Sequence, residues 1–133
     1  MKTSTVLNFK GDCEAAFRFY EQHLGGQPGS IFRYEGSPLA ASVPPDWQNK
    51  VMHGSIVVGD HVLMGGDFLE SQYQAPQGFT LSLQMSDTAD AERIYKALAQ
   101  EGTVLMPLEK TFWASRFGQV VDRFGIPWQI NCE

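Results

Sequence analysis

His53 is the candidate general base of this chain. It lies in the β-rich segment 52–58 (MHGSIVV), where strand alternation places Ser55 on the same face. A histidine that acts as a base needs an orienting partner and a pKa near the working pH. Asp67, just after the next β-rich segment, is a possible partner. The alternative is a structural histidine that is hydrogen-bonded at a sheet edge.

The other reactive side chains point to structural roles. Cys13 falls on an apolar helical stripe, so we expect it to pack in the core as an inert thiol. Cys13 and Cys132 are too few and too far apart for a metal knuckle or a redox pair, which predicts two reduced thiols. The chain has no Ser-His-Asp order, P-loop or G-x-G-x-x-G motif.

Periodicity predicts that one β-α-β-β-β unit occurs twice. The first unit has strands at 3–9, 29–34, 52–58 and 61–66, and a helical stripe at Cys13, Ala16, Phe17, Tyr20 and Leu24. The second has strands at 79–85, 103–110, 116–122 and 127–131, and a stripe at Ala91, Ile94, Tyr95 and Leu98. Asp12 and Asp87 are the predicted helix caps, and Gly25-Gly26 and Gly102 the predicted helix ends.

Sliding the chain by 75 positions supports an internal duplication. The shift superposes Thr5 on Thr80, Asp12 on Asp87, Ala16 on Ala91, Arg18 on Arg93 and Tyr20 on Tyr95. We therefore expect a single domain over 1–133, with a first module at 1–70 and a second at 77–133.

Composition excludes several classes of protein. The chain has 133 residues, a formal net charge of −5 and a pI near 5.1. This balance argues against nucleic-acid binding and against a polybasic membrane surface. No segment is apolar over a bilayer-spanning length, and the first residues lack a signal-peptide pattern. We expect a cytoplasmic protein.

Two such modules imply an α+β fold in which a curved mixed sheet surrounds a cleft and the helices lie on the convex side. A cleft of this kind is the default ligand site. Phe112 and Trp113 are either core residues or a stacking platform for a planar ligand. The long segment 36–50, which contains Trp47, is either a lid on the cleft or a surface excursion or dimer contact.

Three motifs carry a resemblance to a known family. They are LNFKGDCEAAFRFYEQHLGG, KVMHGSIVVGDHVLMGGD and WASRFGQVVDRFGIPWQIN. The whole chain resembles the vicinal-oxygen-chelate superfamily of glyoxalases, extradiol dioxygenases and bleomycin-resistance proteins. Within it, the chain resembles the PhnB-like branch, also described as 3-demethylubiquinone methyltransferase-like. The resemblance implies a glyoxalase-like fold and a homodimer.

The resemblance also implies where a divalent metal is bound in many members, namely on the first and fourth strands of each half. Those positions match Thr5 and either Leu63 or Met64 in the first half, and Thr80 and Gln129 in the second. Because Zn²⁺, Ni²⁺ and Fe²⁺ favour imidazole, carboxylate or thiolate ligands, we expect no metal and no other cofactor here.

The hypothesis is a metal-independent protein that binds a small organic molecule through Thr5, His53, Ser55, Thr80, Trp113 and Gln129. Hydroxyl and amide groups at these positions can orient a polar ligand by hydrogen bonds. One alternative is a metal-dependent lyase, transferase or dioxygenase of the same superfamily that uses His53 and Asp67. A second is a protein that sequesters an antibiotic or toxin without transforming it.

Overall fold

The computed structural model describes all of residues 1–133 and confirms the doubled β-α-β-β-β order. The chain divides into two compact units, Met1–Ala75 and Pro76–Glu133. The first contains β1 (Thr5–Phe9), α1 (Cys13–Leu24), β2 (Gln27–Arg33), β3 (Val51–Val58) and β4 (His61–Asp67). The second contains β5 (Leu81–Met85), α2 (Thr88–Ala99), β6 (Thr103–Glu109), β7 (Arg116–Val121) and β8 (Pro127–Cys132). The class is α+β.

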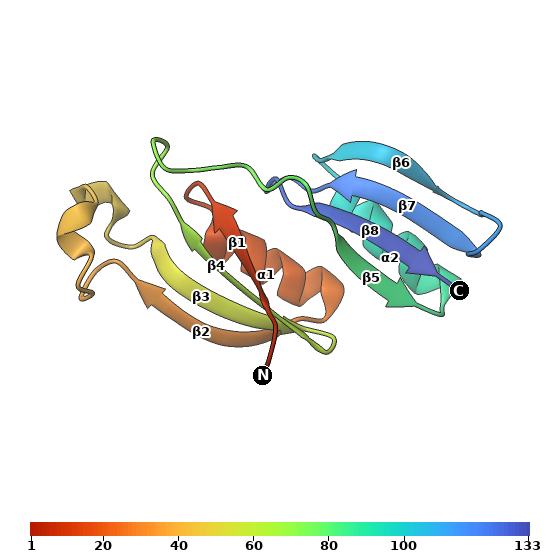
Figure 1. Ribbon diagram of the computed structural model, residues 1–133, viewed down its shortest axis with the longest axis horizontal. Helices are drawn as coiled ribbons and strands as arrows, with labels where there is room; N and C mark the ends of the chain where they lie inside the picture. Colours follow the sequence, from red (N-terminus) through yellow and green to blue (C-terminus); the bar gives the residue numbers. More distant parts are fainter. The chain divides into compact units, whose positions relative to one another are not determined.

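Each unit is one four-stranded sheet with one helix on one face (Figure 1). The strand orders are β1-β4-β3-β2 and β5-β8-β7-β6. In both sheets the first strand runs parallel to its neighbour, and the remaining pairs are antiparallel. The face without a helix is called the open face below.

The core of the first unit lies between its sheet and α1. Leu7, Phe9 and Phe17 are fully buried, and the rings of Phe9 and Phe17 meet edge to face at 5.9 Å. Gly65 is required beneath these rings, because a Cβ there would lie 3.0 Å from the Phe9 ring and 2.9 Å from the Leu7 carbonyl oxygen. Leu7 and Phe9 therefore define the helix-covered face, and strand alternation places Thr5 on that face as well.

The second core is built in the same way against α2. Ala91, Leu98, Val120 and Ile130 are fully buried, and Trp128 nearly so. Gly118 lies beneath Tyr95, since a Cβ there would be 2.9 Å from the Tyr95 ring. These contacts place Gly118 and Val120 of β7, and Trp128 and Ile130 of β8, on the helix-covered face.

The 75-residue offset holds for the helices but not for the first strands. α1 begins at residue 13 and α2 at residue 88, whereas β1 begins at residue 5 and β5 at residue 81, an offset of 76. Residues 10–12 join β1 to α1, but only residues 86–87 join β5 to α2. The counterpart of Thr5 is therefore Leu81, and Thr80 lies one residue before β5.

Two predicted helix signals are wrong in detail. Asp12 is at the N-cap position of α1, but its side chain makes no capping hydrogen bond, whereas Asp87 accepts one from the Ala89 N–H at 2.9 Å. Gly102 does not end α2, which stops at Ala99. Gly102 is needed instead because a Cβ there would lie 2.4 Å from the Val121 carbonyl oxygen.

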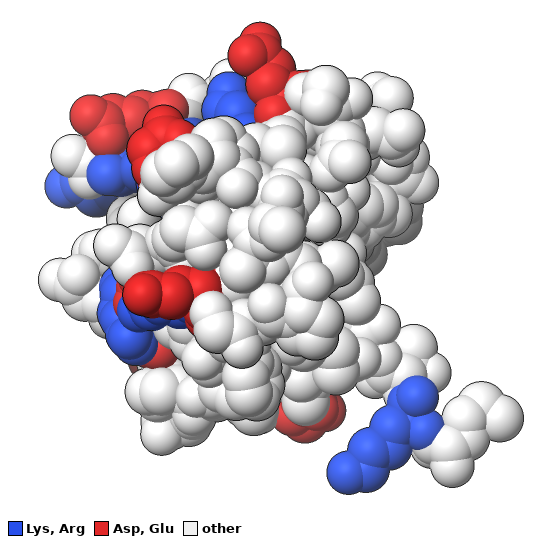
Figure 2. All heavy atoms as spheres, turned by 90° about the vertical axis from the view of Figure 1, so that its left-hand side faces the viewer, with Lys and Arg blue, Asp and Glu red and all other residues white.

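The segment between β2 and β3 is folded onto its own unit. It contains two 3₁₀ turns, Ala40–Ser42 and Pro45–Trp47. Backbone hydrogen bonds from Tyr34 to Lys50 and from Glu35 to Gln48 close it at its base. Figure 2 faces this side of the molecule and shows acidic and basic side chains side by side in small clusters, separated by uncharged surface. No helix of the structure is long and apolar enough to cross a membrane.

Candidate functional site

The open face of the second sheet carries a hydrogen-bonded row of polar side chains. Gln119 of β7 pairs with Gln129 of β8, and Gln129 pairs with Ser82 of β5. Gln119 Nε2 donates to Gln129 Oε1 at 3.5 Å, and Gln129 Nε2 donates to Ser82 Oγ at 3.0 Å. These three residues are called the amide row below.

The amide row forms because neighbours across a sheet share a face. Trp128 and Ile130 point toward α2, so Gln129 between them points to the open face. The β7–β8 turn sets Gln119 directly opposite Gln129. Asp122 fixes this turn: its carboxylate accepts the Phe124 and Ile126 backbone N–H groups at 2.8 and 3.0 Å.

A second row lies one pleat along the same face and ends in aromatic residues. Phe117 of β7 pairs with Asn131 of β8, which pairs with Gln84 of β5. The Trp113 indole N–H donates to Asn131 Oδ1 at 3.2 Å, and its ring meets the Phe117 ring at 5.3 Å. We refer to Trp113, Phe117 and Phe112 as the aromatic corner.

Of the predicted ligand-binding residues, Gln129 and Trp113 lie on or beside this open face, in neighbouring rows. Thr80 precedes β5 and is exposed. Sequence reasoning missed Gln119, Asn131 and Phe117 as members of the site. Counting partners outward from the predicted strand ends at residues 122 and 127 would have set Val120 opposite Gln129. The turn closes instead between Asp122 and Ile126, which makes Gln119 the partner.

In the first unit, the predicted residues fall on different faces of the sheet. His53 is exposed on the open face beside Phe32, its partner on β2. Ser55 shares this face and accepts a hydrogen bond from the Ser30 N–H at 3.2 Å. Thr5 lies on the helix-covered face, where its hydroxyl is 2.9 Å from His61 Nε2.

His53 and Asp67 do not meet. Asp67 is 1% exposed, and its carboxylate is occupied by the backbone N–H groups of Gly11, Cys13 and Val51 at 2.9–3.0 Å. The carboxylate thus lies at the start of α1, on the face opposite His53. Asp67 is a structural crosslink, so the histidine lacks the acidic partner that a base at this position was expected to have.

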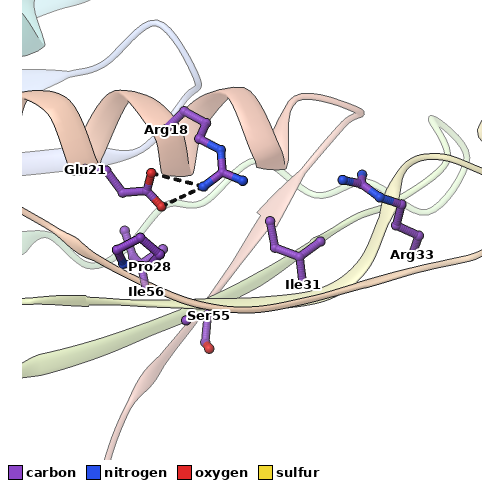
Figure 3. Close-up of a pocket in the computed structure, with 8 residues that line it drawn as sticks. Arg18, Glu21, Pro28, Ile31, Arg33, Ser55 and Ile56 are labelled. Atoms are coloured by element: carbon purple, nitrogen blue, oxygen red, sulfur yellow. Dashed lines mark hydrogen bonds and ion pairs between the residues drawn. The ribbon is translucent and has the colours of Figure 1, made fainter.

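Figure 3 shows the difference between the two faces of the first sheet. The Ile31 and Ile56 side chains point toward α1, whereas the Ser55 hydroxyl points away from it. The crevice between α1 and β2 has a volume of about 210 Å³. Arg18 and Arg33 both line this crevice, and each is paired with a glutamate: Arg18 with Glu21 at 3.0 Å and Arg33 with Glu14 at 2.9 Å.

Cys13 is fully buried at the start of α1, as expected from its stripe. Burial raises the pKa of its thiol, and the nearby Asp67 carboxylate raises it further. A thiol in this setting stays protonated and unreactive.

The side chains at the family's metal positions do not fit a divalent ion. Strand pairing and the open face make Val6 and Met64 the counterparts of Ser82 and Gln129. Of the two residues predicted on the fourth strand of the first half, Leu63 pairs with Thr5 on the helix-covered face, and Met64 pairs with Val6 on the open face. Neither the aliphatic and thioether groups of the first unit nor the hydroxyl and amide of the second include a ligand that Zn²⁺, Ni²⁺ or Fe²⁺ favours. No group of three or more His, Cys, Asp or Glu residues could hold a metal ion.

Comparison with known proteins agrees with this fold. Residues 4–130 match the model of the Glyoxalase/Bleomycin resistance protein/Dioxygenase superfamily. The chain is 30% identical to Protein YjdN of Escherichia coli K12, over 98% of this chain and 95% of that protein.

Two solved structures have the same fold. Protein PA1353 from Pseudomonas aeruginosa is 42% identical, with a TM-score of 0.88 over 100% of this chain and 98% of its own. A PhnB protein from Bacillus cereus is 24% identical, with a TM-score of 0.85 over 100% of both chains.

Proposed function

Because the chain belongs to the glyoxalase/bleomycin resistance protein/dioxygenase superfamily, we propose that it binds a small organic molecule on the open face of its second sheet, without a metal. The observation that carries this proposal is the amide row, Gln119–Gln129–Ser82. Its middle member occupies the position at which many relatives are expected to place a metal ligand.

The amide row supports binding because its side chains keep hydrogen-bond donors and acceptors that a polar ligand can use. Each amide engages one N–H in the row and retains its second N–H, and the Gln119 carbonyl oxygen remains an acceptor. The Ser82 hydroxyl accepts from Gln129 and can donate its own hydrogen outward. A hydrogen bond of this neutral kind adds about 1 kcal/mol. The row therefore orients a ligand more than it tightens binding.

The same face supports binding better than proton transfer. The two central rows contain amide, hydroxyl and aromatic side chains, none of which exchanges a proton readily near neutral pH. A general base needs a group that titrates in that range. His53, the predicted base, lies in the other unit and faces away from Asp67.

The proposal can be tested by grafting the first unit's own side chains onto the second. Gln129→Met and Ser82→Val install the residues that occupy the equivalent positions, Met64 and Val6. Chelator-treated wild-type protein and each variant are screened against one library of small polar compounds by ligand-observed NMR. We expect the wild-type protein to bind a subset without metal, and both variants to lose about tenfold in affinity for it.

Gln100→Met is the matched control, because Gln100 is an exposed residue at the end of α2. It makes the same chemical change away from the open face and should keep wild-type binding. Binding that appears only when a divalent metal is added would contradict the proposal. So would equal binding by wild-type protein and Gln129→Met.

The proposed setting is the cytoplasm, and the proposed assembly is a homodimer. The cytoplasm is supported by two unpaired, buried cysteines, which suit a reducing compartment. The dimer rests on the resemblance to the family and on the prevalence of two-fold symmetric oligomers. Light scattering coupled to size-exclusion chromatography would test it: we expect twice the chain mass of 14.8 kDa.

A further inference from the structure

The connection between β6 and β7 exposes two neighbouring aromatic side chains. Phe112 is 97% exposed and Trp113 is 51% exposed. Exposing this much aromatic surface forgoes the stabilisation that burial gives, so a large exposed aromatic pair marks a binding surface more often than a single exposed residue does.

The connection is held in one conformation by its own hydrogen bonds. Thr111 Oγ1 accepts from the Trp113 and Ala114 backbone N–H groups at 3.3 and 3.1 Å. The Thr111 N–H in turn donates to the Ala114 carbonyl oxygen at 3.0 Å. The aromatic pair therefore projects from a closed turn, and ordering it on binding costs little conformational entropy.

The Trp113 ring is fixed in orientation as well as in position. Its indole N–H is bound to Asn131, and its ring meets Phe117 at an interplanar angle of 68° and Phe112 at 81°. Both neighbours are edge-to-face, so neither covers the Trp113 ring by parallel stacking. About half of Trp113 therefore remains accessible to a flat ligand.

The aromatic corner lies one pleat from the amide row. Phe117 and Gln119 are two residues apart on β7, and Asn131 and Gln129 are two apart on β8. Two residues along a strand span about 7 Å. A planar molecule of two fused rings has a similar length, so one molecule can contact Trp113 and reach the amide row.

The ligand's charge also follows from this surface. The side chains of the two rows are themselves uncharged, and the carboxylates nearest to them along the strands are Glu109, opposite Phe117 on β6, and Glu133, two residues after Asn131. The amide row offers both N–H donors and a carbonyl acceptor, which suits a neutral group that has the complementary pair.

We propose that the aromatic corner and the amide row together recognise a neutral, planar, two-ring compound that carries an N–H donor and a carbonyl acceptor on one edge. This inference rests on the proposed function and names the class of ligand for the same face. The ring stacks on Trp113, and its polar edge bonds to Gln129 and Gln119.

The probe for this test is 2-quinolone, which has two fused rings and a lactam edge. Two companions remove parts of this structure: 2-piperidone keeps the lactam but has neither the second ring nor the aromatic plane, and N-methyl-2-quinolone lacks only the N–H donor. We expect 2-quinolone to shift the NMR signals of the Trp113 indole N–H and the Gln129 side-chain amide. We expect each companion to bind at least fivefold more weakly.

Variants separate the contribution of the ring from a folding effect. Trp113→Ala should weaken 2-quinolone binding at least tenfold, and Trp113→Phe, which keeps a ring, about threefold. Phe32→Ala is the control, because Phe32 is a similarly exposed aromatic residue, 56% exposed, in the first unit. It should leave the affinity unchanged.

Three results would overturn the inference. They are equal binding of 2-piperidone and 2-quinolone, wild-type affinity in Trp113→Ala, and a change of oligomeric state in Trp113→Ala. The last would make the aromatic corner a protein interface. If polar non-aromatic compounds still require Gln129, the proposed function survives and only the ligand class is wrong. If no compound in either experiment depends on Gln129, the proposed function also fails.

Discussion

Asp67 is the buried carboxylate on which the first unit most depends. It is 1% exposed, and it accepts three backbone N–H groups that come from two separate parts of the chain. Gly11 and Cys13 belong to the start of α1, and Val51 begins β3. The prediction is that Asp67→Asn destabilises the unit even though it preserves the shape of the side chain.

The magnitude follows from the individual hydrogen bonds. An asparagine carbonyl can replace Oδ1 and keep Gly11 and Cys13, but its NH₂ group then faces the Val51 N–H. Leaving one buried N–H unpaired costs about 1–3 kcal/mol, and the two remaining bonds lose their charge assistance, at about 1 kcal/mol each. The expected loss is about 3–5 kcal/mol, which is a large part of the roughly 5–15 kcal/mol that stabilises a typical protein.

Urea unfolding followed by far-ultraviolet circular dichroism measures this loss. For a slope of about 1.5 kcal/mol per molar urea, the midpoint of Asp67→Asn should fall by about 2–3 M. Asp60→Asn is the control, because Asp60 is exposed in the β3–β4 turn. It should shift the midpoint by less than about 0.3 M. A similarly small shift for Asp67→Asn would refute the reasoning.

Three further predictions concern other buried positions. Asp122→Asn should destabilise the second unit by about 2–3 kcal/mol in urea unfolding, because the Asp122 carboxylate accepts two backbone N–H groups and the Trp128 indole N–H at 2.8 Å; an unchanged midpoint would argue against this role. Gly118→Ala should lower the thermal midpoint, because the new Cβ would lie 2.9 Å from the Tyr95 ring and 3.0 Å from backbone, at an expected cost of about 1–3 kcal/mol. Burial raises the pKa of Asp12, whose Oδ1 has no hydrogen-bond partner. The folded protein therefore binds a proton at Asp12 more tightly than the unfolded chain does. The stability gained in this way is complete below the usual aspartate pKa and is lost as the pH rises through the raised pKa. Asp12→Asn should consequently be more stable than wild type at pH 7. The free energies of unfolding of the two proteins should converge at acid pH, and a difference that persists there would contradict this.

The order and boundaries of the elements were largely accessible from the sequence. Alternating strands, two apolar helical stripes and the Asp87 cap depend on local chemistry, which a linear pattern displays directly. The resemblance to the family was confirmed by the matched model and by the relatives. Gln129 was singled out through the resemblance, which implies a metal-ligand position on the last strand of each half.

Which residues of the two units are equivalent depended on the length of the connection between the first strand and the helix, which the sequence left ambiguous by one residue. The β1–α1 connection is one residue longer than β5–α2, which makes Leu81 the counterpart of Thr5. Because side chains alternate with a period of two, a slip of one residue moves every side chain of a strand to the other face. That slip explains why Thr80 is not the equivalent of Thr5. Thr5 itself shares the helix-covered face with Leu7 and Phe9, and its hydroxyl lies 2.9 Å from His61 Nε2.

The sequence by itself determined the repeated unit, its helices and strands, and the scarcity of metal-ligating side chains at the family positions. Only the tertiary structure decided which residues share a face: it brought Gln119, Gln129 and Ser82 into one row and separated His53 from Asp67. The physical reason is that helices and strands follow from contacts between near neighbours in the chain. The site follows from strand pairing between segments up to 47 residues apart, whose register is set by turns and connections of variable length.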